Sequence, residues 1–198
     1  MARKIKKIVA RDTIYIICGG KTEKIYFEEF KKAFHKEAGG IKWDIKEKSK
    51  DPVKVVEEAK NIYLAKEDCL EVWAIFDKDD FVNFDEAIAL ANKNNIKCAW
   101  SSQAFEVWFL NYKSSLQGPL HRDKYKSRIK KDFGFDYDKK TSMVEAFVKD
   151  LMNKDEIKTA ANNANIAHSK HMREKQDQPF SNYESCTTVY ELINRLLS

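Results

Sequence analysis

The sequence predicts an α/β fold, in which a largely parallel sheet of about four strands is flanked by helices. Two observations support this class. Short apolar runs that suit buried strands alternate with longer segments of helical spacing over residues 13–115. After residue 117 the strand-like runs stop and the patterns are mostly helical. We therefore expect a basic arm over 1–12, an α/β core over 13–116 and a helical C-terminal region over 117–198 that packs on the core.

A glycine-containing turn joins the first predicted strand to the first helix. Residues Thr13–Cys18 form an apolar run, and the sequence Gly-Gly-Lys-Thr-Glu follows at 19–23. A helix of about fifteen residues is expected next, with Thr22 as its N-cap and Glu23 in its first turn. This unit brings backbone N–H groups and a helix N-terminus to the carboxyl edge of the sheet. The spacing of an ATP-binding phosphate loop is absent.

The other strands and helices follow in alternation. Further strands are predicted at 41–45, 72–76 and 96–100. Helices are predicted from Asp51-Pro52 onward, over 84–94, from 105–110, and then over 143–152, 155–174 and 187–197. Each early helix connects two strands, which is the pattern of a parallel sheet covered on both faces.

The strand predicted at 72–76 ends in a cluster of acids. It reads Val-Trp-Ala-Ile-Phe and is followed by Asp77, Asp79 and Asp80. Asp77 and Asp79 fall on one side of the chain just past the carboxyl end of the strand, where open α/β sheets bind ligands. Close carboxylates repel each other unless a cation lies between them, and such oxygen ligands suit Mg²⁺ or Mn²⁺. The alternative is that these aspartates cap the next helix.

Composition restricts the class of protein. Of the 198 residues, 43% are hydrophobic and 34% are charged, and the net charge is +5. This balance is compatible with nucleic-acid binding but does not require it. The four cysteines are widely spaced and form neither a zinc nor a disulfide pattern. No apolar stretch has membrane-spanning length and no signal-peptide pattern is present, so we expect a cytoplasmic protein.

Basic side chains supply candidate contacts for nucleic acid. The segment 121–131 is the most basic part of the chain, and it is either a track for nucleic acid or an exposed helix. Its candidate residues are Arg122, Lys124, Lys126, Arg128 and Lys130. Lys21, beside the glycine turn, either pairs with a phosphate or is solvated.

Three further residues are candidates for supporting roles. Glu106 stands within the apolar run 105–110, where a carboxylate needs a partner, so it is expected to support the site or to contact a basic residue. His168 and His171 are three residues apart on a predicted helix. One interpretation is that they bind RNA phosphates or act as a general base. The favoured interpretation is that they belong to a solvated polar face of the helix.

These motifs together resemble the RloB-like family, whose members are small bacterial proteins with a Toprim-like fold. The resemblance rests on the turn Gly-Lys-Thr-Glu, the strand end Phe-Asp-Lys-Asp-Asp and the segment Phe-Glu-Val-Trp-Phe-Leu, and it covers nearly the whole chain. The family usually has Asn-Pro-x-Thr-x-Val near its C-terminus. This chain instead has Tyr-Glu-Ser-Cys-Thr-Thr-Val at 183–189.

The resemblance implies a Toprim site. In Toprim enzymes a glutamate of the first turn acts as general acid or base, and an Asp-x-Asp pair binds divalent metal for phosphodiester chemistry. Carried over to this chain, Glu23, Asp77 and Asp79 supply catalytic groups and, together with Asp80, metal ligands. The turn of the OLD-type nucleases reads Glu-Gly-x-x-Glu, which places Gly19 where the first glutamate is expected. A natural loss, an engineered change or a shifted alignment would each account for this departure.

Two functions are compatible with these residues. The first is a Toprim-like, Mg²⁺- or Mn²⁺-dependent nuclease of RNA (including tRNA) or DNA in bacterial anti-phage defence. By resemblance, an AAA- or ABC-type ATPase encoded nearby would be its partner. Loss of a general acid or base lowers a rate by about 10²–10⁴, so Gly19 predicts a weakened or inactive enzyme. The second is a non-catalytic Toprim-like module that binds the ATPase or nucleic acid. A homodimer is compatible with either function.

Overall fold

The computed structural model describes residues 10–116 and 118–198. Of the predicted basic arm, residues 1–9 lie outside the described residues. Within the described part, four strands and eight α-helices follow one another in the predicted α/β order, with helices alone after the last strand. No helix of this part is long and apolar enough to cross a bilayer.

The sheet is parallel throughout. Its strands are β1 (Thr13–Cys18), β2 (Lys42–Glu47), β3 (Cys69–Asp77) and β4 (Lys97–Ser101). All neighbouring pairs run in the same direction, in the spatial order β2-β1-β3-β4. The predicted parallel sheet of four strands is therefore confirmed, with strand ends within a few residues of the expected positions.

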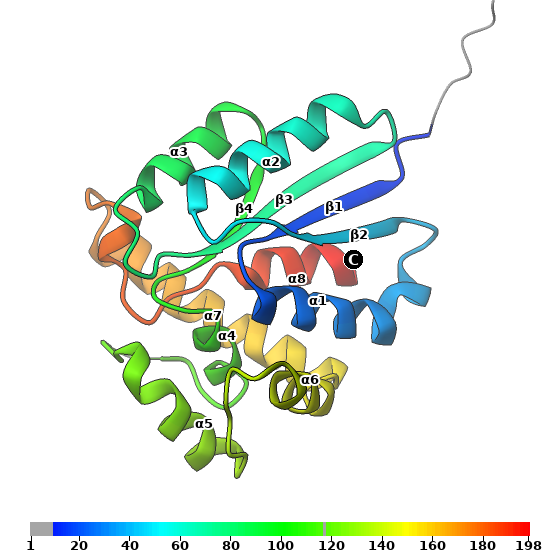
Figure 1. Cartoon of the computed structure of the whole chain (residues 1–198). Coiled ribbons are helices and arrows are strands. Elements are labelled where there is room, and N and C mark those ends of the chain that lie inside the picture. Colours follow the sequence, from blue (N-terminus) through cyan, green and yellow to red (C-terminus); the bar gives the residue numbers. More distant parts are fainter. Residues whose placement is uncertain (1–9, 117) are drawn as a thin grey trace, which may run out of the picture.

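Helices cover both faces of the sheet (Figure 1). Alternation along β1 places Ile14 and Ile16 in one apolar cluster and Tyr15 and Ile17 in the other. The first face is covered by α1 (Lys21–Phe34) and α8 (Val189–Leu197), and the second by α2 (Pro52–Ala65) and α3 (Phe84–Lys93). Beyond α1 and α8 lie α4 (Glu106–Leu110), α5 (Tyr125–Phe133), α6 (Thr141–Asp150) and α7 (Lys154–Glu174).

Aromatic side chains join α1 to the helices that follow the sheet. The ring of Tyr26 on α1 lies 5.6 Å from that of Phe105 and 6.1 Å from that of Trp108, both edge-on. Phe109 in turn lies 5.3 Å from Phe147 of α6. Such edge-to-face pairs orient rings as well as burying them. Phe105 and the helix α4 that follows it are thereby fixed beside the carboxyl end of β3.

The last predicted helix begins later than expected. We predicted a helix over 187–197, whereas α8 begins at Val189. The two preceding threonines pair with the edge strand β4: Thr188 N–H donates to the Trp100 carbonyl and Thr188 Oγ1 accepts from Trp100 N–H, each at 2.9 Å. Thr187 forms an antiparallel bridge with Ser101. These bonds cover part of an otherwise open sheet edge.

Glu71 of β3 ties α8 to the sheet. It accepts from Arg195 Nε at 2.6 Å, from Lys97 Nζ at 3.0 Å and from Trp73 Nε1 at 3.1 Å. Burial alone would raise the pKa of Glu71, but these three donors outweigh it and lower the pKa. The carboxylate therefore stabilises the fold above its ordinary pKa, and this stabilisation is lost as the pH falls through the lowered value.

Replacing Glu71 by glutamine is expected to lower the free energy of unfolding at pH 7 by about 1 kcal/mol, because partly exposed pairs are screened by water. The difference from the wild type should shrink below about pH 4. Urea unfolding at both pH values measures it. Glu57→Gln, on the exposed side of α2, is the matched control. If Glu71→Gln lowered the free energy of unfolding by the same amount at both pH values, the stabilising role of the Glu71 carboxylate would be contradicted.

Candidate functional site

A pocket of about 390 Å³ lies at the carboxyl ends of β1 and β3. The chain leaves β1 for β2 on one side and returns to β3 on the other side of β1. The crevice between β1 and β3 is thus the point at which the strand order reverses, and open α/β sheets bind ligands at such points. The acids that line the pocket are Glu23, Glu47, Asp77, Asp79 and Glu106.

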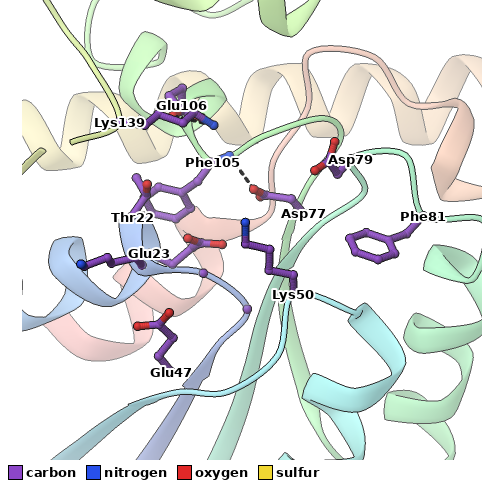
Figure 2. Close-up of a pocket in the computed structure, with 13 residues that line it drawn as sticks. Thr22, Glu23, Glu47, Lys50, Asp77, Asp79, Phe81, Phe105, Glu106 and Lys139 are labelled. Atoms are coloured by element: carbon purple, nitrogen blue, oxygen red, sulfur yellow. Dashed lines mark hydrogen bonds and ion pairs between the residues drawn. The ribbon is translucent and has the colours of Figure 1, made fainter. Parts of the chain in front are cut away.

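Glu23 enters the pocket from the first turn of α1 (Figure 2). We predicted Thr22 as the N-cap, but α1 begins at Lys21 and Gly20 is its N-cap. Gly20 leaves room for the Glu23 side chain, since a Cβ on Gly20 would lie only 2.7 Å from Glu23 Oε2. Burial raises the pKa of Glu23 to about 7, and the charge of Glu106 adds to the rise. Glu23 therefore tends to keep its proton up to about pH 7, because water no longer stabilises its charged form.

Asp77 closes β3 and faces the same pocket. Its Oδ2 accepts from the backbone N–H of Phe105 at 3.0 Å. Its Oδ1 is buried and has no hydrogen-bond partner within the described residues. Burial, followed by the charges of Glu23 and Glu106, raises the pKa of Asp77 well above its ordinary value. A buried acceptor without a partner, beside a second carboxylate, is an arrangement that a cation would relieve.

Glu106 is held by two neighbouring donors at the edge of the pocket. It is 2% exposed, and its Oε1 accepts from Tyr137 Oη at 2.9 Å and from Lys139 Nζ at 3.1 Å. Of the two roles expected for Glu106, the contact with a basic residue is therefore present. Lys139 itself is 60% exposed at its side chain, so its ammonium group also reaches the pocket.

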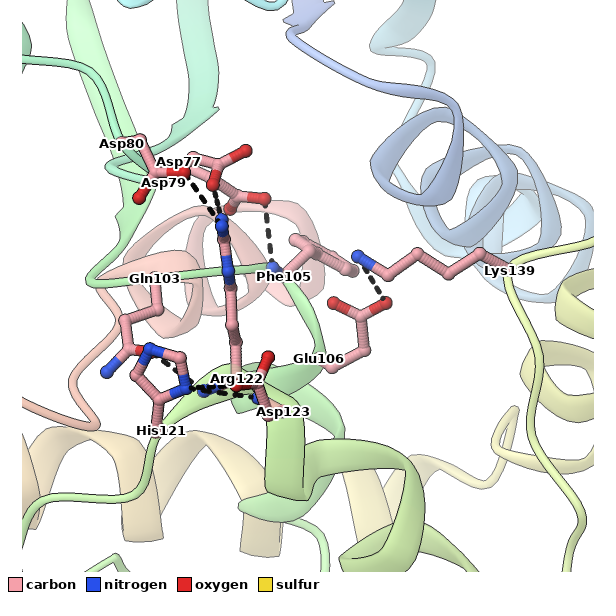
Figure 3. Close-up of polar contacts among 10 residues, drawn as sticks. All are labelled: Asp77, Asp79, Asp80, Gln103, Phe105, Glu106, His121, Arg122, Asp123 and Lys139. Atoms are coloured by element: carbon pink, nitrogen blue, oxygen red, sulfur yellow. Dashed lines mark hydrogen bonds and ion pairs between the residues drawn. The ribbon is translucent and has the colours of Figure 1, made fainter.

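Asp79 and Asp80 both contact Arg122 (Figure 3). Arg122 Nη2 lies 2.7 Å from Asp80 Oδ2, and Arg122 Nη1 contacts Asp79 Oδ1. Asp79 has a φ of 42°, a left-handed conformation that is uncommon outside glycine and that often marks functional turns. Asp79 lines the pocket, whereas the side chain of Asp80 is 88% exposed and lies on the outer side of the turn.

The predicted metal ligands are only partly brought together. Within residues 10–116 and 118–198, no group of three or more histidine, cysteine, aspartate or glutamate side chains is placed to hold a metal ion. Glu23 and Asp77 share the pocket, and Asp79 turns toward Arg122. Two carboxylates nevertheless fit Mg²⁺, which usually keeps several waters and takes one or two protein carboxylates.

Gly19 marks a close approach between β1 and β3. Its N–H donates to the Ile75 carbonyl at 2.7 Å, and a Cβ built on it would lie 3.1 Å from the same oxygen. Its backbone lies outside the left-handed region, so a larger residue is restricted by this contact and not by dihedral strain. A side chain at this position would begin at the floor of the acid pocket.

The model of the RloB-like protein family matches residues 14–196. The chain belongs to the RloB-like family. The match begins in β1 and ends in α8, so it includes the whole sheet, the acid pocket and the C-terminal helices. None of the curated proteins compared with this RloB-like chain matches it.

Most of the predicted nucleic-acid contacts of the RloB-like chain are paired with acids. Lys126 lies 2.7 Å from Asp138, Arg128 lies 2.5 Å from Asp132 and Lys130 lies 3.1 Å from Asp136. These residues, with Arg122 and Lys124, belong to α5 and the short 3₁₀ turn before it.

Three of these candidates lie at pockets. Lys21 lines the acid pocket. Arg122 and Lys126 line a neighbouring pocket of about 410 Å³, which shares Asp77 and Asp79 with the acid pocket. These three candidates therefore lie close to the acids of the two pockets.

The two histidines lie elsewhere, and the favoured solvated face is wrong for His168. Its Nδ1 is hydrogen-bonded to Tyr190 Oη at 3.0 Å, and its ring lies 5.8 Å from that of Trp100. Burial, and then the charge of His171, lowers the pKa of His168 to about 4. His171 Nε2 donates to the Glu184 carbonyl at 2.8 Å. Neither histidine lines the acid pocket; His168 packs on Trp100 of β4, and His171 stacks on Tyr183 at 5.1 Å.

Four site residues escaped the sequence analysis. Glu47 ends β2 and Lys50 follows it, and both reach the acid pocket, as Figure 2 shows for Lys50. A signal existed for them, because the carboxyl ends of parallel strands meet at one edge of the sheet. Tyr137 and Lys139 come from the segment between α5 and α6, and no spacing in the sequence connects them with β1 or β3.

The raised pKa of Glu23 predicts a pH-dependent stability. The folded chain keeps a proton on Glu23 up to about pH 7, whereas an ordinary glutamate releases it near 4.5. The folded state binds more protons in this range, so its stability falls as the pH rises and then levels off above about pH 7. Relative to Glu23→Gln, the wild type should lose up to about 3 kcal/mol between pH 5 and pH 8 in urea unfolding. If the free energies of unfolding of the wild type and Glu23→Gln changed with pH in the same way, this expectation would be contradicted.

Proposed function

We propose that this RloB-like chain is a Toprim-like metal-dependent nuclease whose turnover is weakened because Gly19 lacks a carboxylate. The observation that carries the proposal is the buried, unpaired Oδ1 of Asp77 in a pocket shared with Glu23. In this proposal the two carboxylates hold Mg²⁺ or Mn²⁺. When bound, such a cation supplies a bound water of lowered pKa and offsets the charge that develops on a phosphodiester.

The charges of the pocket support a phosphodiester substrate. Three lysines, Lys21, Lys50 and Lys139, line the same pocket as Glu23 and Asp77. Lys21 and Lys50 form no ion pair within the described part of the chain, so their ammonium groups are available for phosphate oxygens. Lysine binds phosphate as a point charge without geometric constraint. This arrangement favours a phosphodiester backbone over a specific base, and it suits RNA and DNA equally.

Glu106 and its two donors have a positioning role in this proposal. Tyr137 and Lys139 hold the Glu106 carboxylate, and the backbone N–H of the preceding Phe105 holds Asp77. The first turn of α4 therefore fixes Asp77 from one side while its Oδ1 stays open to the pocket. Rigid carboxylates held before a ligand binds need little reorganisation afterwards.

A non-catalytic module is the second candidate function. Gly19 supports it because no side chain at that position transfers a proton. The ion pairs of Arg122 with Asp79 and Asp80 support it as well, because they give two of the four predicted metal ligands a cationic partner without a metal. Such a module would bind an ATPase partner or nucleic acid through the lysine-lined pocket. The ATPase partner and the role in anti-phage defence follow only from the family resemblance.

The two functions separate in one assay. The wild type and Gly19→Glu are incubated with Mg²⁺ or Mn²⁺ and with tRNA, single-stranded DNA and duplex DNA, each with and without an ATPase encoded nearby. The nuclease proposal expects metal-dependent cleavage by Gly19→Glu and slow or no cleavage by the wild type. If neither protein cleaves any substrate while both bind Mn²⁺, the non-catalytic module is the better description.

A further inference from the structure

We propose that Arg122 exchanges partners when a nucleic-acid strand binds. In the free protein Arg122 holds Asp79 and Asp80; a phosphate of the bound strand takes over the guanidinium, and the released Asp79 then joins Glu23 and Asp77 around the divalent cation. The proposal rests on the proposed metal site and deepens it. It makes cation binding and strand binding mutually dependent.

Arg122 is positioned for such an exchange. Its backbone N–H donates to Gln103 Oε1 at 2.8 Å, and Gln103 belongs to the segment that follows β4. The backbone of Arg122 is therefore fixed, while its side chain lines the neighbouring pocket, contacts Asp79 and is 35% exposed. The planar guanidinium group also carries pairs of N–H donors along its edges. Such a pair matches the two oxygens of a carboxylate or of a phosphate.

The contacts of Arg122 are weak enough to be displaced. The side chain of Asp80 is 88% exposed and that of Asp79 is 44% exposed. Ion pairs between such exposed groups are screened by water and contribute little, so a backbone phosphate, which also presents one negative charge on two oxygens, competes with them. In the absence of a ligand, the pairing with Arg122 therefore reduces the repulsion between Asp79 and Asp80. It is also weak enough for a ligand to displace.

Asp79 is the residue whose release matters. It lines both the acid pocket and the neighbouring pocket that contains Arg122, Tyr125 and Lys126. Figure 3 shows its carboxylate near that of Asp77, with the guanidinium group of Arg122 joined to Asp79 and Asp80. A strand that crosses from one pocket to the other thus passes Arg122 before it reaches Glu23. Removal of the guanidinium therefore leaves a third carboxylate at the pocket.

The test measures Mn²⁺ affinity by titration calorimetry, with a phosphorothioate oligothymidylate as the strand. Arg122→Gln is expected to bind Mn²⁺ about tenfold more tightly than the wild type in the absence of the strand. The strand is expected to tighten Mn²⁺ binding in the wild type and to do so much less in Arg122→Gln. By linkage, Mn²⁺ should tighten strand binding to the wild type by the same factor as the strand tightens Mn²⁺ binding.

Two controls separate the exchange from general electrostatics. Lys126→Gln removes the same charge from the neighbouring pocket without touching Asp79. A double-mutant cycle with Asp79→Asn asks whether the effect of Arg122→Gln requires the Asp79 carboxylate. The exchange predicts little effect of Lys126→Gln, and no effect of Arg122→Gln once Asp79 is asparagine. Thermal unfolding verifies that each variant is folded.

The outcomes distinguish this inference from the proposed function. Mn²⁺ affinity that is equal in the wild type and Arg122→Gln, or raised as much by Lys126→Gln, overturns the exchange and leaves the metal site intact. An absence of Mn²⁺ binding in all proteins, with or without the strand, overturns the metal site and the exchange with it. Tighter binding in Arg122→Gln alone supports the exchange.

Discussion

Replacing Gly19 by glutamate is expected to raise the rate of metal-dependent phosphodiester cleavage by about 10²–10⁴, the range typical of one general acid or base. Gly19 lines the pocket that contains Glu23 and Asp77, so we expect a carboxylate from this position to reach the pocket. The measurement is the single-turnover rate on whichever tRNA or DNA substrate is cleaved.

A close contact between Gly19 and the backbone of β3 opposes this substitution. A Cβ on Gly19 would lie 3.1 Å from the Ile75 carbonyl oxygen, so β1 and β3 must separate slightly where they meet. Gly19→Ala measures this steric effect alone, and Gly19→Gln reproduces the shape of glutamate without its charge. Activation by Gly19→Gln equal to that by Gly19→Glu would contradict a role in proton transfer or metal binding.

Asp77→Asn is expected to have opposite effects on activity and on stability. In the Gly19→Glu background it should lower the cleavage rate by at least about 100-fold, because the proposed cation loses one of its carboxylates. In the metal-free protein at pH 8 it should raise the free energy of unfolding. The cause is the removal of a charge that burial and the neighbouring Glu23 and Glu106 disfavour.

The amide oxygen of the new asparagine still accepts the bond from the Phe105 N–H, so the first turn of α4 should keep its place. Asp123→Asn is the matched control, since it removes an exposed carboxylate from the neighbouring pocket. Urea unfolding and cleavage rates of both variants give the comparison. An Asp77→Asn protein that is less stable than the wild type and fully active would contradict the assigned role.

The sequence predicted the elements of the site because parallel strands constrain where their ends lie. The apolar run before Asp77 and the glycine turn before Glu23 were sufficient to place both residues at one edge of the sheet. The same rule, applied to β2, would also have found Lys50. Local patterns therefore predict which acids meet, provided that each belongs to a regular βα unit.

Contacts between distant segments could not be predicted in this way. Lys139 reaches Glu106 from a loop between two helices, and the ion pairs of Arg122 with Asp79 and Asp80 depend on how that region folds over the sheet. His168 has a polar sequence context, yet it packs on Trp100 because α7 lies against the edge of the sheet. Tertiary packing decides these cases, and hydrophobic periodicity does not report it.

The central claim is that Glu23 and Asp77 together hold a divalent cation. Titration calorimetry with Mn²⁺ on the wild type, Glu23→Gln and Asp77→Asn tests it most directly, because it requires neither a substrate nor a partner. We expect one Mn²⁺ per wild-type chain and an affinity at least about tenfold lower in each variant. Equal Mn²⁺ affinity in all three proteins would contradict the claim.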